Sequence, residues 1–408
     1  MKKYSFPKEK IKIYLFEKIH DQARIAFEEA GYSVTCVPDS RQGEQLDEIF
    51  ENAHVIGVRS RSKVLEDNLS KAKRLLAIGC FTVGTDQVEL GAAKNCGIPV
   101  FNAPHSSTRS VAELAISSLI ALARKVGEMN LGMHRGEWNK SAAGSYEVRG
   151  KTLGVIGYGH IGQQTALLGE AIGLNVVFYD ILKKLPLGRN AQIDSLNKLL
   201  STSDFVSLHV PGTEETKGMF TKDLIAKMKQ GAYLLNLSRG NVVDIDALVS
   251  ALKEGKIAGA AIDVFPSEPK SNQESFSSPL CGMDNVILTP HIGGSTEEAQ
   301  KNIGDEVAQT LIRFLDNGST QGSVNFPNVH LPAFPESHRI LNVHHNRPGV
   351  LSDVNALISK IGANINSQYL STSGDIGYLI MDINKELAGE LSSEMANLEH
   401  SIKTRILY

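Results

Sequence analysis

The stretch that most constrains the fold is residues 151–180, KTLGVIGYGHIGQQTALLGEAIGLNVVFYD. Its pattern predicts a strand over 152–156, a glycine turn, a helix, and a second strand over 175–179 that ends beside Asp180. The turn fits G-x-G-x-x-G, with Gly157, Gly159 and Gly162 at the glycine positions. Such glycines allow a tight turn, close approach of the backbone to a pyrophosphate, and close packing of a helix on a strand. The stretch therefore predicts a βαβ unit that binds a dinucleotide; the alternative is a purely structural glycine turn.

The same stretch indicates which dinucleotide binds. The helix that follows the turn offers unpaired N–H groups and the positive end of its dipole to a phosphate. Asp180 follows Gly162 at roughly the 20-residue spacing at which an acid accepts hydrogen bonds from an adenosine ribose. A carboxylate at this position would repel the additional phosphate of NADP. We therefore expect the cofactor to be NAD.

Length and composition set the outer bounds. A chain of 408 residues predicts two or three domains. Its net charge of −3 gives no general attraction to nucleic acid or to an anionic membrane. The N-terminus lacks the apolar core of a signal peptide, and the most apolar helical stretch, 111–123, is too short to span a bilayer. Because four cysteines are scattered without metal-binding spacing, we expect reduced thiols rather than two disulfides, no metal site, and a cytoplasmic protein.

Residues 10–100 form a separate alternating pattern. Strands are predicted over 11–15, 34–37, 55–58, 75–78 and 100–101, and helices over 20–30, 44–52, 66–72 and 88–95. This alternation predicts a parallel sheet with helices on both faces. One long helix is then predicted over 108–130, with a capping box at Ser110 and Glu113. In the polar segment after it, Trp138 is either an interface anchor or a residue folded onto its own domain.

The dinucleotide unit continues with predicted strands over 205–210, 232–236, 258–264 and 286–289. A helix over 296–317 would lead the chain back towards the first domain, and the proline-bearing segment 318–337 is typical of a linker. From residue 338 the pattern changes to strand 339–345, helix 349–361, a hairpin of 364–371 and 376–383, helix 387–398 and strand 402–407. This βαββαβ order predicts a ferredoxin-like module.

Three polar residues follow predicted strands of the dinucleotide unit, where the site of an open α/β sheet forms. Arg239 can grip a 2-oxo or 2-hydroxy carboxylate through two parallel hydrogen bonds. His291 titrates near neutral pH and can move the hydroxyl proton in either direction. Glu268, bonded to the other ring nitrogen, would fix the tautomer and favour the protonated ring. Singly, each has an ordinary explanation as a solvated or core residue; together they favour a dehydrogenase site.

At these motifs the sequence resembles the NAD-dependent D-isomer-specific 2-hydroxyacid dehydrogenases. The matching segments, in family order, are 157–162 with Asp180, 237–240 (LSRG), 259–265 (GAAIDVF) with Glu268, and 289–296 (TPHIGGST). The resemblance implies two doubly wound α/β domains, with a Rossmann nucleotide domain over 104–294 inserted into a flavodoxin-like substrate domain formed by 1–103 and 295–330. A C-terminal ACT domain over 338–408 is implied by the match of 344–351 (HHNRPGVL).

The resemblance also implies residue roles. Arg239 would bind the substrate carboxylate, Glu268 and His291 would form the acid/base pair, and Asp263 would contact the nicotinamide end of the cofactor. The expected cofactor-binding residues are Gly157, Gly159, His160, Ile161, Gly162, Asp180, Leu237, Ser238, Arg239, Asp263, His291, Ile292, Gly293 and Gly294.

Substrate choice is implied by Val58-Arg59-Ser60-Arg61-Ser62, which follows a predicted strand. Together with the ACT module, it resembles family members that oxidise 3-phospho-D-glycerate in L-serine biosynthesis, because a phosphate needs such a cationic pocket. The expected substrate-binding residues are Arg59, Ser60, Arg61, Ser107 and Lys140. Ser107 stands where the family usually has asparagine. The segment with Trp138 and Lys140 is implied to lie at a dimer contact.

The ACT module implies regulation by L-serine. The expected effector-binding residues are His344, Asn346 and Asn364, in a site that the family forms across two paired ACT domains and that requires an oligomer, expected to be a homotetramer. The linker over 331–338 lacks the adjacent glycines of related chains. Three alternatives stay open: reduction of another 2-oxo acid such as 2-oxoglutarate, a non-enzymatic NAD-sensing partner protein, and an ACT module that only dimerises.

Overall fold

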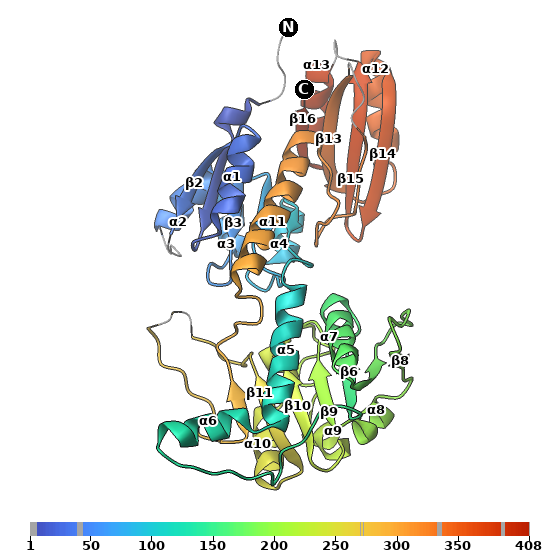
Figure 1. The fold of residues 1–408 in the computed structure, drawn as a ribbon. Helices are drawn as coiled ribbons and strands as arrows, with labels where there is room; N and C mark the ends of the chain where they lie inside the picture. Colours follow the sequence, from blue (N-terminus) through green and yellow to red (C-terminus); the bar gives the residue numbers. More distant parts are fainter. Residues whose placement is uncertain are drawn as a thin grey trace. The chain divides into compact units, whose positions relative to one another are not determined.

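The computed structural model describes residues 6–38, 44–269, 271, 273–332, 337–384 and 388–407. The chain divides into two compact units (Figure 1). Unit 1 comprises Met1–Ser106 and Gln300–Tyr408, and unit 2 comprises Ser107–Ala299. Within the described ranges, no helix is long and apolar enough to cross a membrane, and the four cysteines are free.

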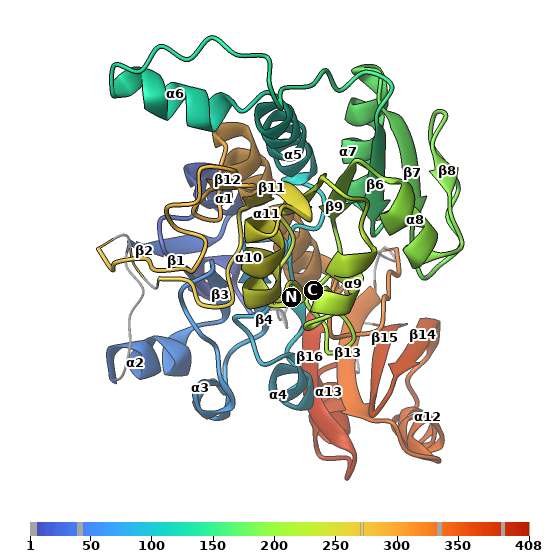
Figure 2. The ribbon, with the colours of Figure 1, turned by 90° about the horizontal axis from the view of Figure 1, so that it is seen from below.

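Unit 2 is built on a seven-stranded parallel sheet with the order β12-β11-β10-β9-β6-β7-β8. Its strands are β6 (Thr152–Ile156), β7 (Asn175–Tyr179), β8 (Ala191–Gln192), β9 (Phe205–Leu208), β10 (Ala232–Asn236), β11 (Ile257–Ile262) and β12 (Val286–Leu288). One face packs on α5 (Thr108–Ala123) and α7 (His160–Ala171), and the other on α8 (Leu196–Thr202), α9 (Lys222–Lys227) and α10 (Ile245–Lys253) (Figure 2). Because both faces are covered, the central strands are continuous apolar runs rather than alternating ones.

The strand order of unit 2 reverses between β6 and β9. Strands β6, β7 and β8 advance towards one edge of the sheet, whereas β9 to β12 advance towards the other. Ligands of open α/β sheets bind outside the carboxyl ends of the strands at such a switch point. The G-x-G-x-x-G turn follows β6 and therefore lies at this position.

The predicted single helix over 108–130 is wrong. The structure has α5, which ends at Ala123, and a separate helix α6 (Val126–His134). Between them Lys125 takes a left-handed φ of 52°, which ends the first helix and changes the direction of the chain. The predicted capping box is also wrong, because α5 begins at Thr108, upstream of it. The Glu113 carboxylate instead pairs with Arg109 at 2.6 Å.

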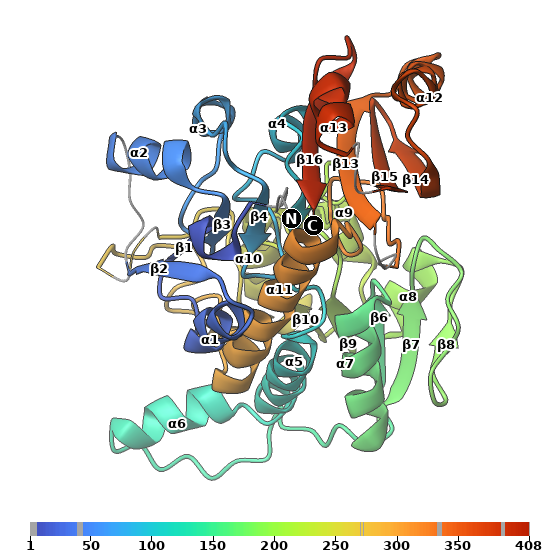
Figure 3. The same cartoon turned by 90° about the horizontal axis from the view of Figure 1, so that it is seen from above.

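Unit 1 contains a five-stranded parallel sheet with the flavodoxin-like order β2-β1-β3-β4-β5. The strands are β1 (Lys12–Phe16), β2 (Ser33–Val37), β3 (Val55–Val58), β4 (Ala77–Cys80) and β5 (Val100–Phe101). Helices α1 (Asp21–Glu29) and α11 (Glu297–Asn317) cover one face, and α2 (Glu44–Asn52), α3 (Glu66–Lys71) and α4 (Leu90–Asn95) cover the other (Figure 3). A short 3-10 helix, η1 (Lys8–Lys10), precedes β1. The order reverses between β1 and β3, which places a second switch point there.

The C-terminal module of unit 1 has the predicted βαββαβ order. Its elements are β13 (Ser337–His345), α12 (Val350–Ile361), β14 (Ile365–Ser373), β15 (Ile376–Asn384), α13 (Ala388–Ala396) and β16 (Ser401–Leu407). The strands form an antiparallel sheet with the order β14-β15-β13-β16. Alternate residues face opposite sides, so Ile340 and Met381 pack with α12 and α13, whereas Leu341 and Tyr378 pack with Phe326.

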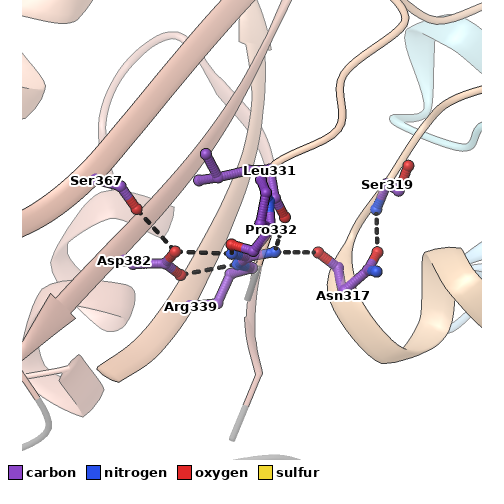
Figure 4. Close-up of polar contacts among 7 residues, drawn as sticks. All are labelled: Asn317, Ser319, Leu331, Pro332, Arg339, Ser367 and Asp382. Atoms are coloured by element: carbon purple, nitrogen blue, oxygen red, sulfur yellow. Dashed lines mark hydrogen bonds and ion pairs between the residues drawn. The ribbon is translucent and has the colours of Figure 1, made fainter. Parts of the chain in front are cut away.

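A buried arginine joins this module to the rest of unit 1 (Figure 4). The Arg339 side chain is fully buried and forms a two-bond ion pair with Asp382, at 2.8 Å from Nε and 2.7 Å from Nη2. Its remaining N–H groups donate to the carbonyl oxygens of Asn317, Leu331 and Pro332 at 2.6–2.9 Å. Arg339 thus fixes the end of α11, and residues 331 and 332 of the predicted linker, to the sheet of this module. Pro335, also in that linker, lies outside the described residues.

Candidate active site

Each glycine of the fingerprint meets a different constraint. Gly157 has a φ of 88°, and a Cβ there would lie 2.5 Å from the His209 carbonyl oxygen. A Cβ on Gly162 would lie 2.1 Å from the Gly157 carbonyl oxygen, so the helix could not approach the strand. At Gly159, the residue before α7, a Cβ would meet no atom of the described chain within 4 Å. Two glycines are therefore required by the fold, and the third faces open space where a ligand can approach.

Asp180 is fixed beside this turn. Its carboxylate accepts the N–H of Tyr158 at 2.8 Å and the N–H of Leu182 at 2.9 Å. The buried Tyr158 ring stacks on Phe178 with 3.6 Å between centroids, which fixes the turn against β7. The acid, the glycine turn and the start of α7, at His160 and Ile161, form one rigid assembly. Its donor groups and its acid suit the pyrophosphate and ribose of a dinucleotide.

Arg239 lies on a loop that its own neighbours hold in shape. The Asn236 side chain accepts the N–H and hydroxyl of Ser238 and donates to the Arg239 carbonyl oxygen at 3.0 Å. A Cβ on Gly240 would lie 2.0 Å from the Phe265 carbonyl carbon, so the loop after β10 packs directly on the loop after β11. Leu237 and Ser238 are buried, and Arg239 is half-buried. Arg239 is thereby presented at the carboxyl edge of the sheet.

Glu268 and His291 form a hydrogen-bonded pair. The His291 Nδ1 lies 2.8 Å from Glu268 Oε2, and Glu268 Oε1 accepts the N–H of Phe265 at 3.1 Å. The His291 side chain is 50% exposed, which leaves room for a substrate at its other nitrogen. The hydrogen bond to a carboxylate orients the ring and selects Nδ1 as the protonated nitrogen of the neutral form. The pair therefore has the arrangement of an acid/base group.

The contact between Glu268 and His291 also shifts the pKa of each residue. The hydrogen bond from Glu268 raises the pKa of His291; burial and the charge of Arg239 oppose the rise, and Asp263 adds to it. Burial acts to raise the pKa of Glu268, but the hydrogen bond and charge of His291, with the Phe265 N–H and the charge of Arg239, together outweigh it, so that this pKa lies below its usual value. Each partner thus favours the charged form of the other.

The backbone at His291 is strained, and Asp263 holds it. His291 has a left-handed φ of 54°, rare for a residue with a side chain. The buried Asp263 carboxylate accepts the N–H of Ile292 at 2.8 Å, the N–H of Gly293 at 2.9 Å and the hydroxyl of Thr289 at 2.6 Å. Asp263 therefore shapes the loop that presents His291. Sequence reasoning missed these hydrogen bonds of Asp263, although an acid directly after an apolar strand was the available signal.

Two further predicted substrate-binding residues, Ser107 and Lys140, belong to unit 2, and the structure brings Ser107 to this loop. A Cβ on Gly294 would lie 3.3 Å from the Ser107 Cβ, so the buried Ser107 at the start of α5 adjoins the glycine pair after His291. Lys140 is exposed, on the extended segment that follows α6. Trp138 in the same segment is 80% exposed, which disfavours the alternative that it folds onto its own domain.

In unit 1, the Arg59 loop follows β3 at the switch point of the five-stranded sheet. Arg59 is half-buried, whereas Ser60 and Arg61 are exposed. Burial, the largest influence, lowers the pKa of the Arg59 guanidinium, and the neighbouring charge of Arg61 acts in the same direction. Two cations this close favour an anionic ligand, because it would relieve their mutual repulsion.

The three predicted effector residues are not together within one chain. His344 is buried beside Gly377, where a Cβ would lie 2.2 Å from its Nε2, and Asn346 donates to the Gly374 carbonyl oxygen at 3.1 Å. Asn364 instead accompanies Asn384, at the opposite end of β15. At about 3.3 Å per residue, the two ends of β15 (Ile376–Asn384) are roughly 26 Å apart. Burial lowers the pKa of His344, which favours its neutral form.

Two family models match the chain. The first, described as the D-isomer specific 2-hydroxyacid dehydrogenase NAD binding domain, matches residues 116–293. The second, described as the AHAS small subunit-like ACT domain, matches residues 340–403. The first match contains the glycine turn, Arg239, Glu268 and His291, and the second covers most of the βαββαβ module. These matches confirm the predicted fold class.

Curated relatives are similar over their full length. The chain is 52% identical over 411 residues to D-3-phosphoglycerate dehydrogenase of Escherichia coli strain K12, covering 100% of both chains. It is 50% identical over 404 residues to the protein of that name from Dictyostelium discoideum, covering 99% of each. Among solved structures, D-lactate dehydrogenase from Aquifex aeolicus complexed with NAD and lactic acid matches 78% of this chain and 100% of its own, with a TM-score of 0.69 and 30% identity.

Proposed function

Because this chain belongs to the D-3-phosphoglycerate dehydrogenases, we propose that its site catalyses the reversible oxidation of 3-phospho-D-glycerate to 3-phosphooxypyruvate with NAD. The observation that carries this proposal is the Glu268–His291 pair at 2.8 Å, on loops of the same sheet that presents the glycine turn and Arg239. When bound, NAD supplies the acceptor for the hydride that leaves C2 of the substrate. Every other role falls to residues of the chain.

In the proposed reaction, His291 takes the hydroxyl proton at Nε2 during oxidation and returns it during reduction. Nδ1 is occupied by Glu268, which stabilises the imidazolium that forms. Arg239 holds the substrate carboxylate through its planar guanidinium. The glycine turn, with His160 and Ile161, binds the pyrophosphate, and Asp180 binds the adenosine ribose. Ile292, Gly293 and Gly294, with Leu237 and Ser238, line the nicotinamide end, and Asp263 maintains that loop.

Arg59 and Arg61, with Ser60, are proposed to bind the substrate phosphate. The support is their position at a switch point and the repulsion between the two cations. The same pair would also accept a second carboxylate, so 2-oxoglutarate is the competing substrate. Ser107, beside Gly294, is proposed as a further substrate contact. Lys140 is proposed to reach the active site of a neighbouring chain, because its segment is expected at a dimer contact. A non-enzymatic NAD-sensing role needs no acid/base pair and is the weaker reading.

The ACT module is proposed to bind L-serine across two chains. Support comes from the separation of Asn364 from His344 and Asn346, since two modules paired side by side in opposite orientation would bring opposite ends of their sheets together. This arrangement requires an oligomer, for which we propose a homotetramer. We also propose the domain boundaries 1–103 with 295–330, 104–294 and 338–408, and a cytoplasmic location, which suits the free thiols.

An NADH-oxidation assay with 3-phosphooxypyruvate, 2-oxoglutarate and pyruvate tests the proposal. The expected order of kcat/KM is 3-phosphooxypyruvate first and pyruvate last, because only pyruvate lacks a second anionic group for Arg59 and Arg61. Equal or better use of pyruvate would remove the phosphate assignment. No NADH oxidation with any of the three, from folded protein that binds NADH, would favour the sensory alternative.

A further inference from the structure

A buried acid that the proposed mechanism does not use lies beneath the Arg59 loop. Glu17 directly follows β1 and is 8% exposed. Glu17 and Lys18 take left-handed φ values of 60° and 52°. Two consecutive residues with side chains rarely adopt this conformation. The chain therefore turns sharply at this point, and the turn directs the Glu17 carboxylate to the neighbouring loop rather than to solvent.

The carboxylate collects the backbone amides of that loop. Glu17 Oε1 accepts the N–H of Ser62 at 2.7 Å and the N–H of Arg59 at 3.3 Å, and Oε2 accepts the N–H of Arg61 at 2.9 Å. Hydrogen bonds to an ionised acceptor are stronger than neutral ones. Three such bonds, from three of the four residues of segment 59–62 to one carboxylate, hold the backbone of that segment in one conformation.

The bonds cross the switch point of the sheet. Glu17 belongs to the loop after β1 and Arg59 to the loop after β3, and these adjacent strands continue towards opposite edges. The connections that leave β1 and β3 therefore lead away from each other, and contacts between the two loops come from side chains, including a 3.5 Å bond from Arg59 Nη1 to the Glu17 carbonyl oxygen. Glu17 thus links the two loops where a ligand is expected to bind.

Its charge acts in the same place. Arg59 and Arg61 repel each other, whereas the negative charge of Glu17 stabilises the guanidinium of Arg59. With its oxygens turned to the backbone amides, Glu17 offsets the repulsion from the inner side. The outer side of the loop is left to an anion from solvent.

We propose that Glu17 is a positioning residue for phosphate recognition: it holds the Arg59–Arg61 loop in the conformation that binds the substrate phosphate, without touching the substrate. The inference rests on the proposed function, since it assumes that these arginines bind that phosphate. It predicts that a change at Glu17 alters selectivity for a phosphate-bearing substrate and leaves the chemistry in unit 2 unchanged.

The test variant is Glu17→Gln. The amide keeps one acceptor oxygen. Its NH2 group, however, would take the place of a carboxylate oxygen that accepts a backbone N–H in the wild type, so that two donors would face each other. The loop would lose at least one bond, and Arg59 would lose the negative charge of Glu17 that stabilises its guanidinium. Glu17→Asp is the second variant, because it retains the charge but is one methylene too short to reach all three amides. Glu89→Gln is the matched control, since the Glu89 carboxylate in the same unit also accepts a backbone N–H, that of Glu66 at 2.7 Å, which is not an amide of the Arg59–Ser62 segment.

The measurement compares steady-state reduction of 3-phosphooxypyruvate with that of hydroxypyruvate, its phosphate-free counterpart, by the full-length protein. For Glu17→Gln we expect KM for 3-phosphooxypyruvate to rise about tenfold or more, with a smaller rise for Glu17→Asp. The values of kcat, KM for NADH and KM for hydroxypyruvate should stay within about twofold of wild type. Glu89→Gln should match wild type throughout. In an Arg61→Ala background, Glu17→Gln should add much less than it does alone.

Equal loss on both substrates, or a loss of kcat without a change in selectivity, would overturn the inference, because it would indicate a general structural role. Should Glu17→Gln not fold, the same selective rise in Glu17→Asp supports the inference and its absence overturns it. If wild type does not prefer 3-phosphooxypyruvate to hydroxypyruvate, the proposed phosphate site is itself wrong and the inference falls with it. Failure of the proposed phosphate site would appear in the wild type, whereas failure of the Glu17 inference would appear only in the Glu17 variants. The two failures are therefore distinguishable.

Discussion

In the proposed mechanism, His291 is the residue whose environment bears most directly on rate. As a base in oxidation it must be neutral, and as an acid in reduction it must be protonated. Since the bond to Glu268 raises its pKa, oxidation should increase as pH rises through that raised value, and reduction should decrease over the same range. The charges of Asp263 and Arg239 act on the same ring in opposite directions.

Replacing Glu268 by glutamine should shift the pH profiles of oxidation and of reduction in the same direction. The amide cannot stabilise the imidazolium as a carboxylate does, so the pKa of His291 should fall. The rise of oxidation activity with pH should then begin at a lower pH than in wild type. The fall of reduction activity with pH should also begin at a lower pH. Profiles of kcat/KM against pH in both directions provide the measurement. Unchanged profiles in Glu268→Gln would show that another group controls them.

Removing the imidazole tests its role more directly. His291→Ala should lower kcat by about 10²–10⁴-fold, the usual contribution of general acid–base catalysis. NADH binding, followed by fluorescence titration, should change little, because the glycine turn and Asp180 are untouched. Near wild-type turnover with normal NADH binding would rule out His291 as the acid/base.

The glycine turn offers a paired prediction. Gly159→Ala should leave the unfolding midpoint near wild type, because a Cβ there meets no atom of the described chain within 4 Å. It should nevertheless weaken NADH binding about tenfold or more, since the backbone at this position approaches the pyrophosphate. Gly162→Ala should instead lower stability, because its Cβ would lie 2.1 Å from a carbonyl oxygen. Thermal unfolding and NADH titration of both variants separate the two effects.

At the scale of elements, Arg339 connects α11, the segment at Leu331 and Pro332, and the sheet of the ACT module. Its five N–H groups all have acceptors, and its partner Asp382 also accepts the hydroxyl of Ser367 at 2.8 Å. The module makes further bonds to the rest of unit 1: Arg405 to the Leu315 carbonyl oxygen at 2.9 Å, and Tyr378 to that of Gly318 at 2.6 Å. We therefore expect the described part of this connection to be stiff.

Arg339→Met should destabilise the protein by about 3–5 kcal/mol, because it leaves the Asp382 carboxylate buried without its partner. Arg339→Met combined with Asp382→Leu should recover part of that loss, since an apolar pair of similar volume needs no counter-charge. Denaturant unfolding of both single variants and the double variant gives the coupling free energy. Simple additivity would contradict the ion pair as a buried unit.

At the scale of the whole molecule, the proposed effector site is divided between chains. His344→Ala and Asn364→Ala should each weaken L-serine binding in pure oligomers, as measured by calorimetry. Mixed oligomers should regain binding, because a pair of one chain of each kind contains one site with both residues intact and one with neither. About half of the wild-type stoichiometry at that interface is expected. No recovery on mixing would place the residues in a single-chain site, and no heat with wild type would favour a purely structural module.

Local pattern was enough for several parts of the fold and not for others. The predicted strand 55–58 and the hairpin of the C-terminal module match β3, β14 and β15 closely, because short apolar runs and the turn residues that bound them are properties of adjacent positions. The break at Lys125 was missed because an αL residue within an apolar run leaves no periodic signal. The capping box failed for a related reason, since the helix begins upstream of Ser110.

The sequence by itself determined the glycine turn, its acid, the order of Arg239, Glu268 and His291, and the module at the C-terminus. These features depend on residue type and short spacing, which a linear chain displays directly. Only the tertiary structure decided that Glu17 holds the Arg59 loop, that Asp263 holds a strained His291, and that Arg339 joins α11 to a sheet. Those contacts link loops of strands that are neighbours in space and distant in sequence, and no local pattern records which of them meet. Asn364 is the limiting case, because the residues proposed to share its site belong to another chain.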